Sequence, residues 1–126
     1  MRHIHFALIS LGCALLAGVS HAQEIQPRIT LSLEVAGEAT VNSITYQCGS
    51  KTLAVSYVNA GPNLLAILPV EEQSILFTSA IAASGARYTA GPYEWWTKGN
   101  EASLRNLMAE EDAKPLLECS VANQPQ

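Results

Sequence analysis

A serine hydroxyl and a lysine ammonium lie close to one predicted turn of this 126-residue chain. Ser84 opens the run Ser84-Gly85-Ala86-Arg87-Tyr88, and Lys98 lies in the run Tyr93-Glu94-Trp95-Trp96-Thr97-Lys98-Gly99. The intervening Thr89-Ala90-Gly91-Pro92 has turn chemistry, which predicts a β-hairpin. A hydroxyl and a cation on one ribbon are suited to bind carboxyl groups. The pattern therefore indicates a surface that blocks an acidic site on another molecule.

The register of this hairpin determines which residues meet. A hairpin centred on Gly91 places Ser84 opposite Lys98, and opposed residues of antiparallel strands have Cβ atoms about 4.5 to 5.5 Å apart. A turn shorter or longer by one residue would shift this register. Gly85 and Gly99 flank the two residues, as expected where strands give way to loops that approach another surface closely.

Both runs resemble the paired motifs, S-G-x-x-Y and Y-x-x-x-T-K-G, of the bacterial membrane-bound or periplasmic inhibitors of c-type lysozyme. The resemblance extends over about residues 46–119. It implies a host c-type lysozyme as the partner, no cofactor, and the entry of Ser84 and Lys98 into the lysozyme active-site cleft. The other lysozyme-binding residues that it implies are Gly85, Arg87, Tyr88, Tyr93, Thr97 and Gly99.

Several aromatic and basic residues have a second interpretation, which stays open. Tyr88 and Tyr93 are also typical of barrel packing with a tethered hydroxyl, and Arg87 is also typical of a basic residue on an edge strand. Trp95 and Trp96 point to opposite faces of a strand, so one is expected in the core and the other exposed. The alternative function is a periplasmic β-barrel that binds a small ligand or glycan through the tryptophan pair and the barrel mouth.

The first 22 residues have the pattern of a secretory signal peptide. Arg2 and His3 precede an apolar run at residues 6–19, and Ser20-His21-Ala22 places small residues at the positions that a signal peptidase reads. The apolar run is too short to span a bilayer. We therefore expect cleavage and a single exported domain at residues 23–126, soluble in the periplasm.

A lipoprotein anchored through Cys13 is the alternative to a soluble periplasmic protein. Ser10-Leu11-Gly12-Cys13 forms only a partial lipobox, because Ser10 stands where an aliphatic residue is expected, and the apolar run continues past Cys13. Soluble export is the preferred interpretation.

Removal of residues 1–22 changes the chemistry that the chain can perform. All three histidines lie in that segment, so the exported domain lacks the base of a Ser-His-Asp or Cys-His site and the imidazole of a zinc site. It keeps six basic and eleven acidic residues, a net charge of −5. We expect neither an enzyme nor a metal site nor nucleic-acid binding, and the acidic balance favours encounter with basic c-type lysozymes. A homodimer stays open.

Two cysteines, Cys48 and Cys119, remain after cleavage. An oxidising periplasm leaves them one intramolecular pairing, so we expect a disulfide. The inhibitor family also ties an early Y-x-C strand to the end of the chain, and Tyr46-Gln47-Cys48 with Cys119 resembles that bond.

Apolar and polar residues alternate with a period of two along most of the exported domain, as in half-buried strands. Strands are expected at residues 29–35, 44–48, 52–57, 64–70 and 74–78, around Tyr88 and Trp95, and before Cys119. Residues 101–111 fit either a helical turn or a strand followed by an acidic loop. Seven or eight short strands indicate an antiparallel barrel or sandwich, and the resemblance favours a small eight-stranded β-barrel.

Overall fold

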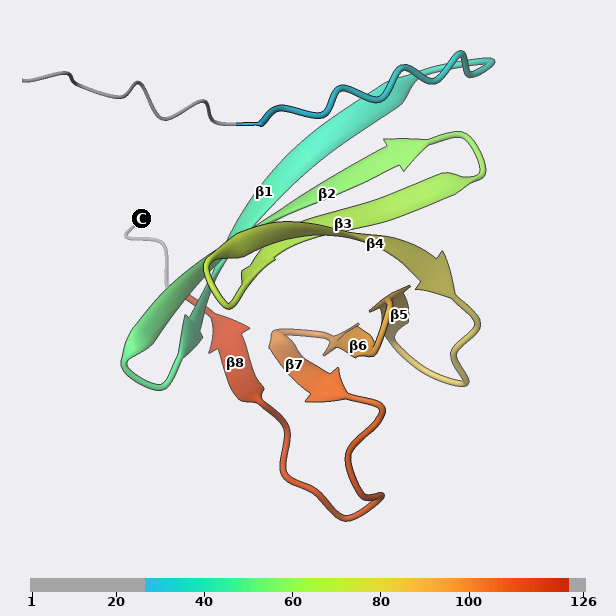
Figure 1. Ribbon diagram of the computed structural model, residues 1–126. Helices are drawn as coiled ribbons and strands as arrows, with labels where there is room; N and C mark the ends of the chain where they lie inside the picture. Colours follow the sequence, from blue (N-terminus) through green and yellow to red (C-terminus); the bar gives the residue numbers. More distant parts are fainter. Residues whose placement is uncertain (1–26, 123–126) are drawn as a thin grey trace, which may run out of the picture. The chain divides into compact units, whose positions relative to one another are not determined.

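The computed structural model describes residues 27–122, in which eight strands are joined by turns and loops (Figure 1). Each strand runs antiparallel to the next, and β8 pairs with β1, so the sheet closes into a barrel. The predicted all-β, eight-stranded antiparallel barrel is confirmed. The strands are β1 (Ala39–Cys48), β2 (Lys51–Ala60), β3 (Asn63–Val70), β4 (Gln73–Ala80), β5 (Ala86–Ala90), β6 (Tyr93–Lys98), β7 (Glu101–Asn106) and β8 (Leu117–Val121). Within residues 27–122, no helix is long and apolar enough to cross a membrane.

Period-two alternation builds the core, because every second side chain of a strand points into the barrel. Trp95, Phe77 and Val55 are fully buried there, and no polar or charged residue of residues 27–122 is buried with them. At one end of the barrel the core opens into an apolar hollow of about 360 Å³ lined mainly by Leu53, Pro69, Val70, Leu104, Leu116 and Leu117.

The aromatic side chains inside the barrel share one hydrogen-bonded network. The Trp95 Nε1–H donates to the Tyr57 hydroxyl over 2.8 Å, and the Tyr57 and Tyr46 hydroxyls lie 2.9 Å apart. The Tyr46 and Trp95 rings meet edge to face, with centroids 5.3 Å apart. Burial, and next the bond to Tyr46, raise the pKa of Tyr57 far above its ordinary value of 10.0. Burial also raises the pKa of Tyr88.

The closure between β1 and β8 is short. It has two opposed pairs, Tyr46 with Val121 and Gln47 with Ser120. The Cys48–Cys119 disulfide joins the same two strands, and both cysteines are buried. The predicted pairing is confirmed. A cross-link between residues 71 apart in sequence stabilises a fold by about 4 kcal/mol on the chain-entropy model.

The predicted strand at residues 29–35 is wrong. Residues 27–38 belong to no strand, and the side chains of Ile29, Leu31 and Leu33 are exposed. Alternation supplies the pattern of a strand, but a strand also needs a neighbour for its hydrogen bonds, and the barrel closes with strands that begin at Ala39. The predicted signal peptide at residues 1–22 lies outside the described residues.

The segment at residues 101–111 follows the second of its two predicted alternatives. Residues 101–106 form β7, and a loop that includes Glu110, Glu111 and Asp112 leads on to β8. Ala102 and Leu104 are buried while Glu101 and Arg105 are exposed. Leu104, Leu107 and Met108 have helical spacing, but residues 101–106 form a strand because β7 pairs with β6 on one side and β8 on the other.

We predict that the free energy of unfolding falls above about pH 10 through Tyr57. There the unfolded chain releases a tyrosine proton that the folded chain still holds, so this contribution is complete below pH 10 and is lost as the pH rises. The loss stays below about 1.4 kcal/mol per pH unit, because solvent screens the partly exposed ring. Urea unfolding at about pH 9 and about pH 11 measures it.

Tyr57→Phe is the control for this prediction. It should unfold more easily at pH 9, because Trp95 and Tyr46 lose their partner, and should lose less stability between the two pH values. An equal loss in both proteins would contradict the role of Tyr57.

Candidate functional site

The two sequence motifs meet on the hairpin of β5 and β6. Ala86 lies opposite Thr97 and Ala90 lies opposite Tyr93, which leaves Gly91 and Pro92 as a two-residue turn. The predicted pairing of Ser84 with Lys98 is therefore wrong by one residue, and Lys98 lies opposite Glu101 of β7. The cause is the turn. Gly91 has a φ of 53° and proline fixes a negative φ after it, the signs that a type II′ hairpin turn requires.

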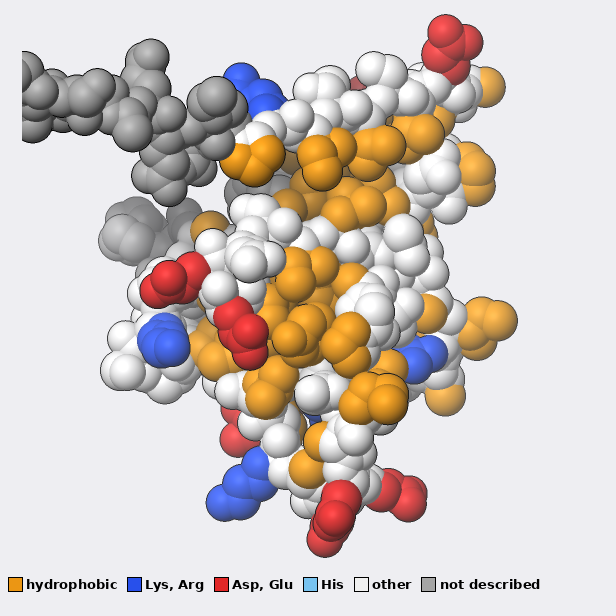
Figure 2. Space-filling model, viewed as in Figure 1, with side chains coloured by type: hydrophobic (Ala, Val, Ile, Leu, Met, Phe, Trp, Pro, Cys, Tyr) orange, Lys and Arg blue, Asp and Glu red, His pale blue; other side chains and the backbone are white. Residues whose placement is uncertain are grey.

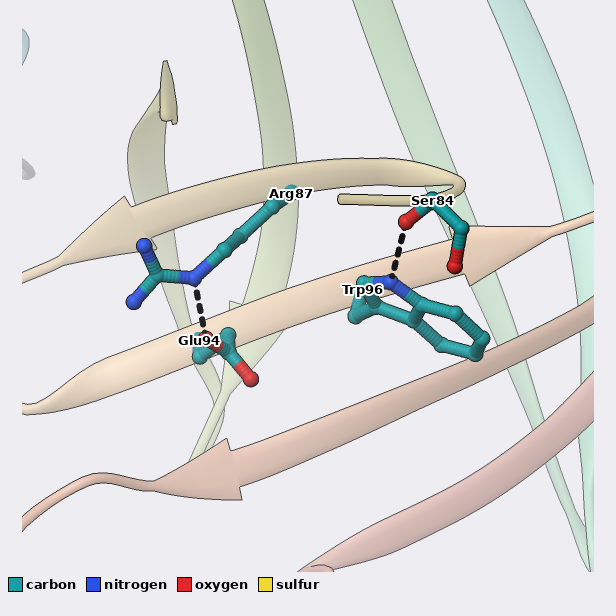
Figure 3. A network of polar contacts seen from close by, with 4 residues as sticks. All are labelled: Ser84, Arg87, Glu94 and Trp96. Carbon is teal, nitrogen blue, oxygen red and sulfur yellow. Dashed lines mark hydrogen bonds and ion pairs between the residues drawn. The ribbon is translucent and has the colours of Figure 1, made fainter. Parts of the chain in front are cut away.

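Ser84 lies in the loop at residues 81–85, which connects β4 to β5 and is called the serine loop below. The Trp96 Nε1–H donates to the backbone oxygen of Ser84 over 3.0 Å (Figure 3). Because Ala86 lies opposite Thr97, the serine loop reaches the end of the hairpin at which Lys98 completes β6. Ser84 and Lys98 are both exposed. The structure thus brings the two residues to one end of the hairpin without pairing them directly.

Gly85 lets the serine loop lie against β6. It has a φ of 71°, and a Cβ at this position would lie 2.3 Å from the Thr97 backbone oxygen and 3.1 Å from two atoms of the Trp96 ring. No side chain fits in that space, and only glycine adopts this backbone conformation readily. The loop therefore needs glycine at this position. Gly99 also has a positive φ, of 60°, but a Cβ there would meet nothing within 4 Å.

Arg87 is engaged within the hairpin. Its guanidinium forms an ion pair with the Glu94 carboxylate, diagonally across from it on β6 (Figure 3). Within residues 27–122, no other pair of oppositely charged side chains lies within 4 Å. The Lys98 ammonium is therefore the motif cation that has no carboxylate partner among the described residues.

The two tryptophans point to opposite faces of β6, as predicted. Trp95 is fully buried in the core, and Trp96 is half-buried on the outside of the barrel. They therefore do not form a shared ligand surface. Tyr88 is 8% exposed and its ring centroid lies 5.7 Å from that of Tyr57, while Tyr93 and Thr97 are half-buried.

Two features of the serine loop were missed by sequence reasoning. One is the bond from Trp96 to Ser84, which joins residues twelve apart and leaves no mark in the motif spacing. The other is Ile81, which is 96% exposed and borders a hollow of about 470 Å³ outside the barrel. The signal for Ile81 was a single large apolar residue in the run Ala80-Ile81-Ala82-Ala83 directly before Ser84.

The candidate site presents two exposed polar groups, the Ser84 hydroxyl and the Lys98 ammonium. Among residues 27–122, no group of three or more His, Cys, Asp or Glu side chains is placed to hold a metal ion. On the face shown in Figure 2, hydrophobic side chains gather in the middle and charged side chains of both signs lie around them. An exposed cation and an exposed hydroxyl at a hairpin end are suited to carboxyl groups of a partner.

The family described as membrane-bound lysozyme-inhibitor of c-type lysozyme matches residues 46–113. A relative from Cupriavidus necator, named membrane-bound lysozyme inhibitor of C-type lysozyme, is 49% identical over 78 residues, which are 61% of this chain and 62% of the relative. A relative of the same name from Pseudomonas aeruginosa is 46% identical over 76 residues, 57% of this chain and 60% of the relative. The chain thus spans about three fifths of the length of these curated relatives.

Two solved structures are similar to the barrel. Pseudomonas aeruginosa MliC, in a crystal structure with hen egg white lysozyme, has a TM-score of 0.64 and 34% identity, with 79% of this chain and 100% of that chain covered. PliC of Salmonella typhimurium, a periplasmic lysozyme inhibitor of C-type lysozyme, has a TM-score of 0.54 and 29% identity, with 65% and 98% covered.

We predict that Gly85→Ala lowers the free energy of unfolding by about 2 to 5 kcal/mol, the sum of a positive-φ penalty of about 1 to 2 kcal/mol and of about 1 to 3 kcal/mol for a clash with the Thr97 oxygen. Gly99→Ala is the matched control, with a similar φ and open space around the Cβ, and should cost only the backbone penalty of about 1 to 2 kcal/mol. Urea unfolding of both variants measures the difference. Equal losses would show that the close approach of the serine loop to β6 is unimportant.

Proposed function

Because the chain belongs to the family of membrane-bound inhibitors of c-type lysozyme, we propose that it inhibits c-type lysozyme and so protects bacterial peptidoglycan. The observation that carries this proposal is the end of the β5–β6 hairpin, where both family motifs come together. The exposed Ser84 and Lys98 lie there on the closed barrel. The structural similarity to MliC, solved with hen egg white lysozyme, supports the same partner.

The chemistry of the target fits the two residues. A retaining glycosidase of the lysozyme class carries two carboxyl groups about 5 to 5.5 Å apart, one protonated and one ionised. The Lys98 ammonium suits the ionised group, and the Ser84 hydroxyl donates to or accepts from either form. We propose that both enter the active-site cleft and that inhibition is by occlusion, with no reaction catalysed by the inhibitor.

The other motif residues divide between contact and support in this proposal. Gly85 and Gly99 allow the backbone to approach the lysozyme surface, and Arg87 borders the contact while paired with Glu94. Tyr88, Tyr93 and Thr97 are buried or half-buried, so we assign them chiefly to holding the hairpin on the barrel. Trp95 is fully buried, which removes the tryptophan pair on which the alternative glycan-binding function depended.

We also propose that residues 1–22 are removed on export and that the domain at residues 23–126 acts in the periplasm. This compartment is oxidising, in agreement with the Cys48–Cys119 disulfide.

We predict that Lys98→Ala weakens inhibition of c-type lysozyme by about 2 to 5 kcal/mol, because it leaves a carboxylate in the cleft without its partner. Ser84→Ala should cost about 1 to 3 kcal/mol if it leaves a buried polar group unpaired. The assay is lysis of peptidoglycan by c-type lysozyme against inhibitor concentration, with g-type lysozyme as a specificity control.

The β1–β2 hairpin offers matched control variants. Ser50 is exposed within its two-residue turn and Lys51 is exposed directly after it, as Lys98 is exposed beside the turn that follows β6. Ser50→Ala and Lys51→Ala should leave inhibition unchanged, and all four variants should keep the thermal stability of the parent. Undiminished inhibition by Ser84→Ala/Lys98→Ala would refute the mechanism, and a parent protein without inhibition would refute the function.

We predict that intact-mass spectrometry of the periplasmic protein finds a chain that begins at Gln23, without a lipid. The small residues of Ser20-His21-Ala22 are the physical reason, because they fit the signal peptidase site. A diacylglyceryl adduct on Cys13 would instead assign a lipoprotein and leave the proposed inhibition intact.

A further inference from the structure

Trp96 is the residue through which the barrel wall holds the serine loop. It lies on β6 between Arg87 of β5 and Ser103 of β7, which are its directly opposed neighbours. Since Trp95 points into the core, Trp96 points outward, and it is half-buried although it contributes nothing to the buried core cluster. The serine loop covers part of the Trp96 side chain, because the Gly85 backbone lies directly against the Trp96 ring.

The hydrogen bond from Trp96 is the one side-chain hydrogen bond that holds the serine loop among the described residues. The pairing of β4 with β5 ends at Ala80 and Arg87, so residues 81–85 lie outside that ladder. Within residues 27–122, the Trp96 Nε1–H is the one side-chain group that donates to or accepts from the loop, and its acceptor is Ser84 itself. The contact therefore acts on the residue whose hydroxyl the proposed function requires.

Gly85 and Trp96 together fix the position of Ser84. The glycine lets the loop backbone approach the ring, and the indole N–H then fixes the Ser84 carbonyl by a hydrogen bond 3.0 Å long. The Trp96 ring lies against the loop, and the hydrogen bond holds the Ser84 peptide group. The Ser84 hydroxyl therefore samples fewer positions before a partner binds. Because the serine loop is already ordered before binding, less conformational entropy is lost when the partner binds.

We infer that Trp96 is a positioning residue, which orders the serine loop so that the Ser84 hydroxyl is presented to an acidic cleft before the partner arrives. This inference rests on the proposed function and assigns a role in inhibition to Trp96, which occupies a variable position of the second motif. Trp96 acts through Ser84 and need not touch the partner.

The test is a double-mutant cycle on the complete exported domain, with Ser84→Ala, Trp96→Phe and the double variant. Phenylalanine keeps an aromatic ring and removes the N–H donor. Trp96→Phe should weaken inhibition of c-type lysozyme about 3- to 10-fold in the parent, the size of one lost hydrogen bond. In the Ser84→Ala background it should weaken inhibition less than about 2-fold, because the hydroxyl to be positioned is already gone.

A direct contact between Trp96 and lysozyme predicts a different result, namely the same fold-change in both backgrounds, and would overturn the inference. Ser103→Ala is the matched control, since Ser103 lies directly opposite Trp96 and makes no side-chain hydrogen bond to the serine loop. It should inhibit as the parent does. Reduced inhibition by Ser103→Ala would show that any change on this part of the outer wall disturbs the site, which also contradicts a specific role of Trp96.

A second measurement needs no lysozyme. Backbone ¹⁵N relaxation should show lower order parameters for residues 82–85 in Trp96→Phe than in the parent. The Trp95 indole N–H is an internal check, because it donates to Tyr57 inside the barrel and its signal should stay in place. Unchanged order parameters would overturn the inference.

The outcomes also separate this inference from the proposed function. If the parent and Trp96→Phe inhibit lysozyme equally well, the role of Trp96 is overturned and the proposed function stands. A parent that does not inhibit overturns the proposed function and with it the purpose of the ordered loop.

Discussion

Closure of the barrel between its first and last strands is the constraint on which the rest of the structure depends. The closure has two opposed residue pairs, fewer than join the strands of any hairpin in the described residues. The Cys48–Cys119 disulfide lies beside these pairs and ties the same strands together. The covalent bond thus reinforces the shortest strand pairing of the barrel. It acts mainly by restricting the unfolded chain, and so complements the native contacts.

Closure also determines which side chains are available for function. Once the strands form a barrel, alternation sends one of two adjacent tryptophans inward and the other outward. Trp95 then joins Tyr46 and Tyr57 in the core, and Trp96 is left on the wall beside the serine loop. A ring anchored in the core thus fixes β6, and β6 supplies both the tryptophan that contacts the loop and the lysine at its end. The serine loop and Lys98 are therefore connected to the core through one strand, β6.

The sequence predicted the parts of this arrangement that depend on local pattern. Alternation located β2, β3 and β4 and the second half of β1, because these segments have one face in the core. The cysteine pair followed once Cys13 was assigned to the predicted signal peptide, because Cys48 and Cys119 then had one possible pairing. Residues 29–35 show the limit of this reasoning, because they alternate as well as any strand but have no pairing partner. The register of the motif hairpin depended on whether Gly91 is the centre or the first residue of the turn, and composition alone does not distinguish the two. The bond from Trp96 to Ser84 was beyond prediction, since it requires the shape of the loop.

The two motif cations illustrate why a site must be assigned from geometry as well as from motif. Arg87 and Lys98 both carry a positive charge, but the motifs specify only Lys98 and leave Arg87 at a variable position. In the structure the Arg87 guanidinium already has a carboxylate partner, Glu94, whose side chain is 16% exposed. For Arg87 to bind a carboxylate of another protein, it must either share its donors or release Glu94, which would leave a partly buried carboxylate without compensation. Lys98 lies at the exposed end of β6 and has no carboxylate partner among the described residues. Binding to an acidic cleft would therefore require the ammonium to lose only its hydration, and no existing ion pair would be broken. This asymmetry favours Lys98 over Arg87 as the cation of the proposed contact, because the Arg87–Glu94 ion pair already joins the two strands of the hairpin.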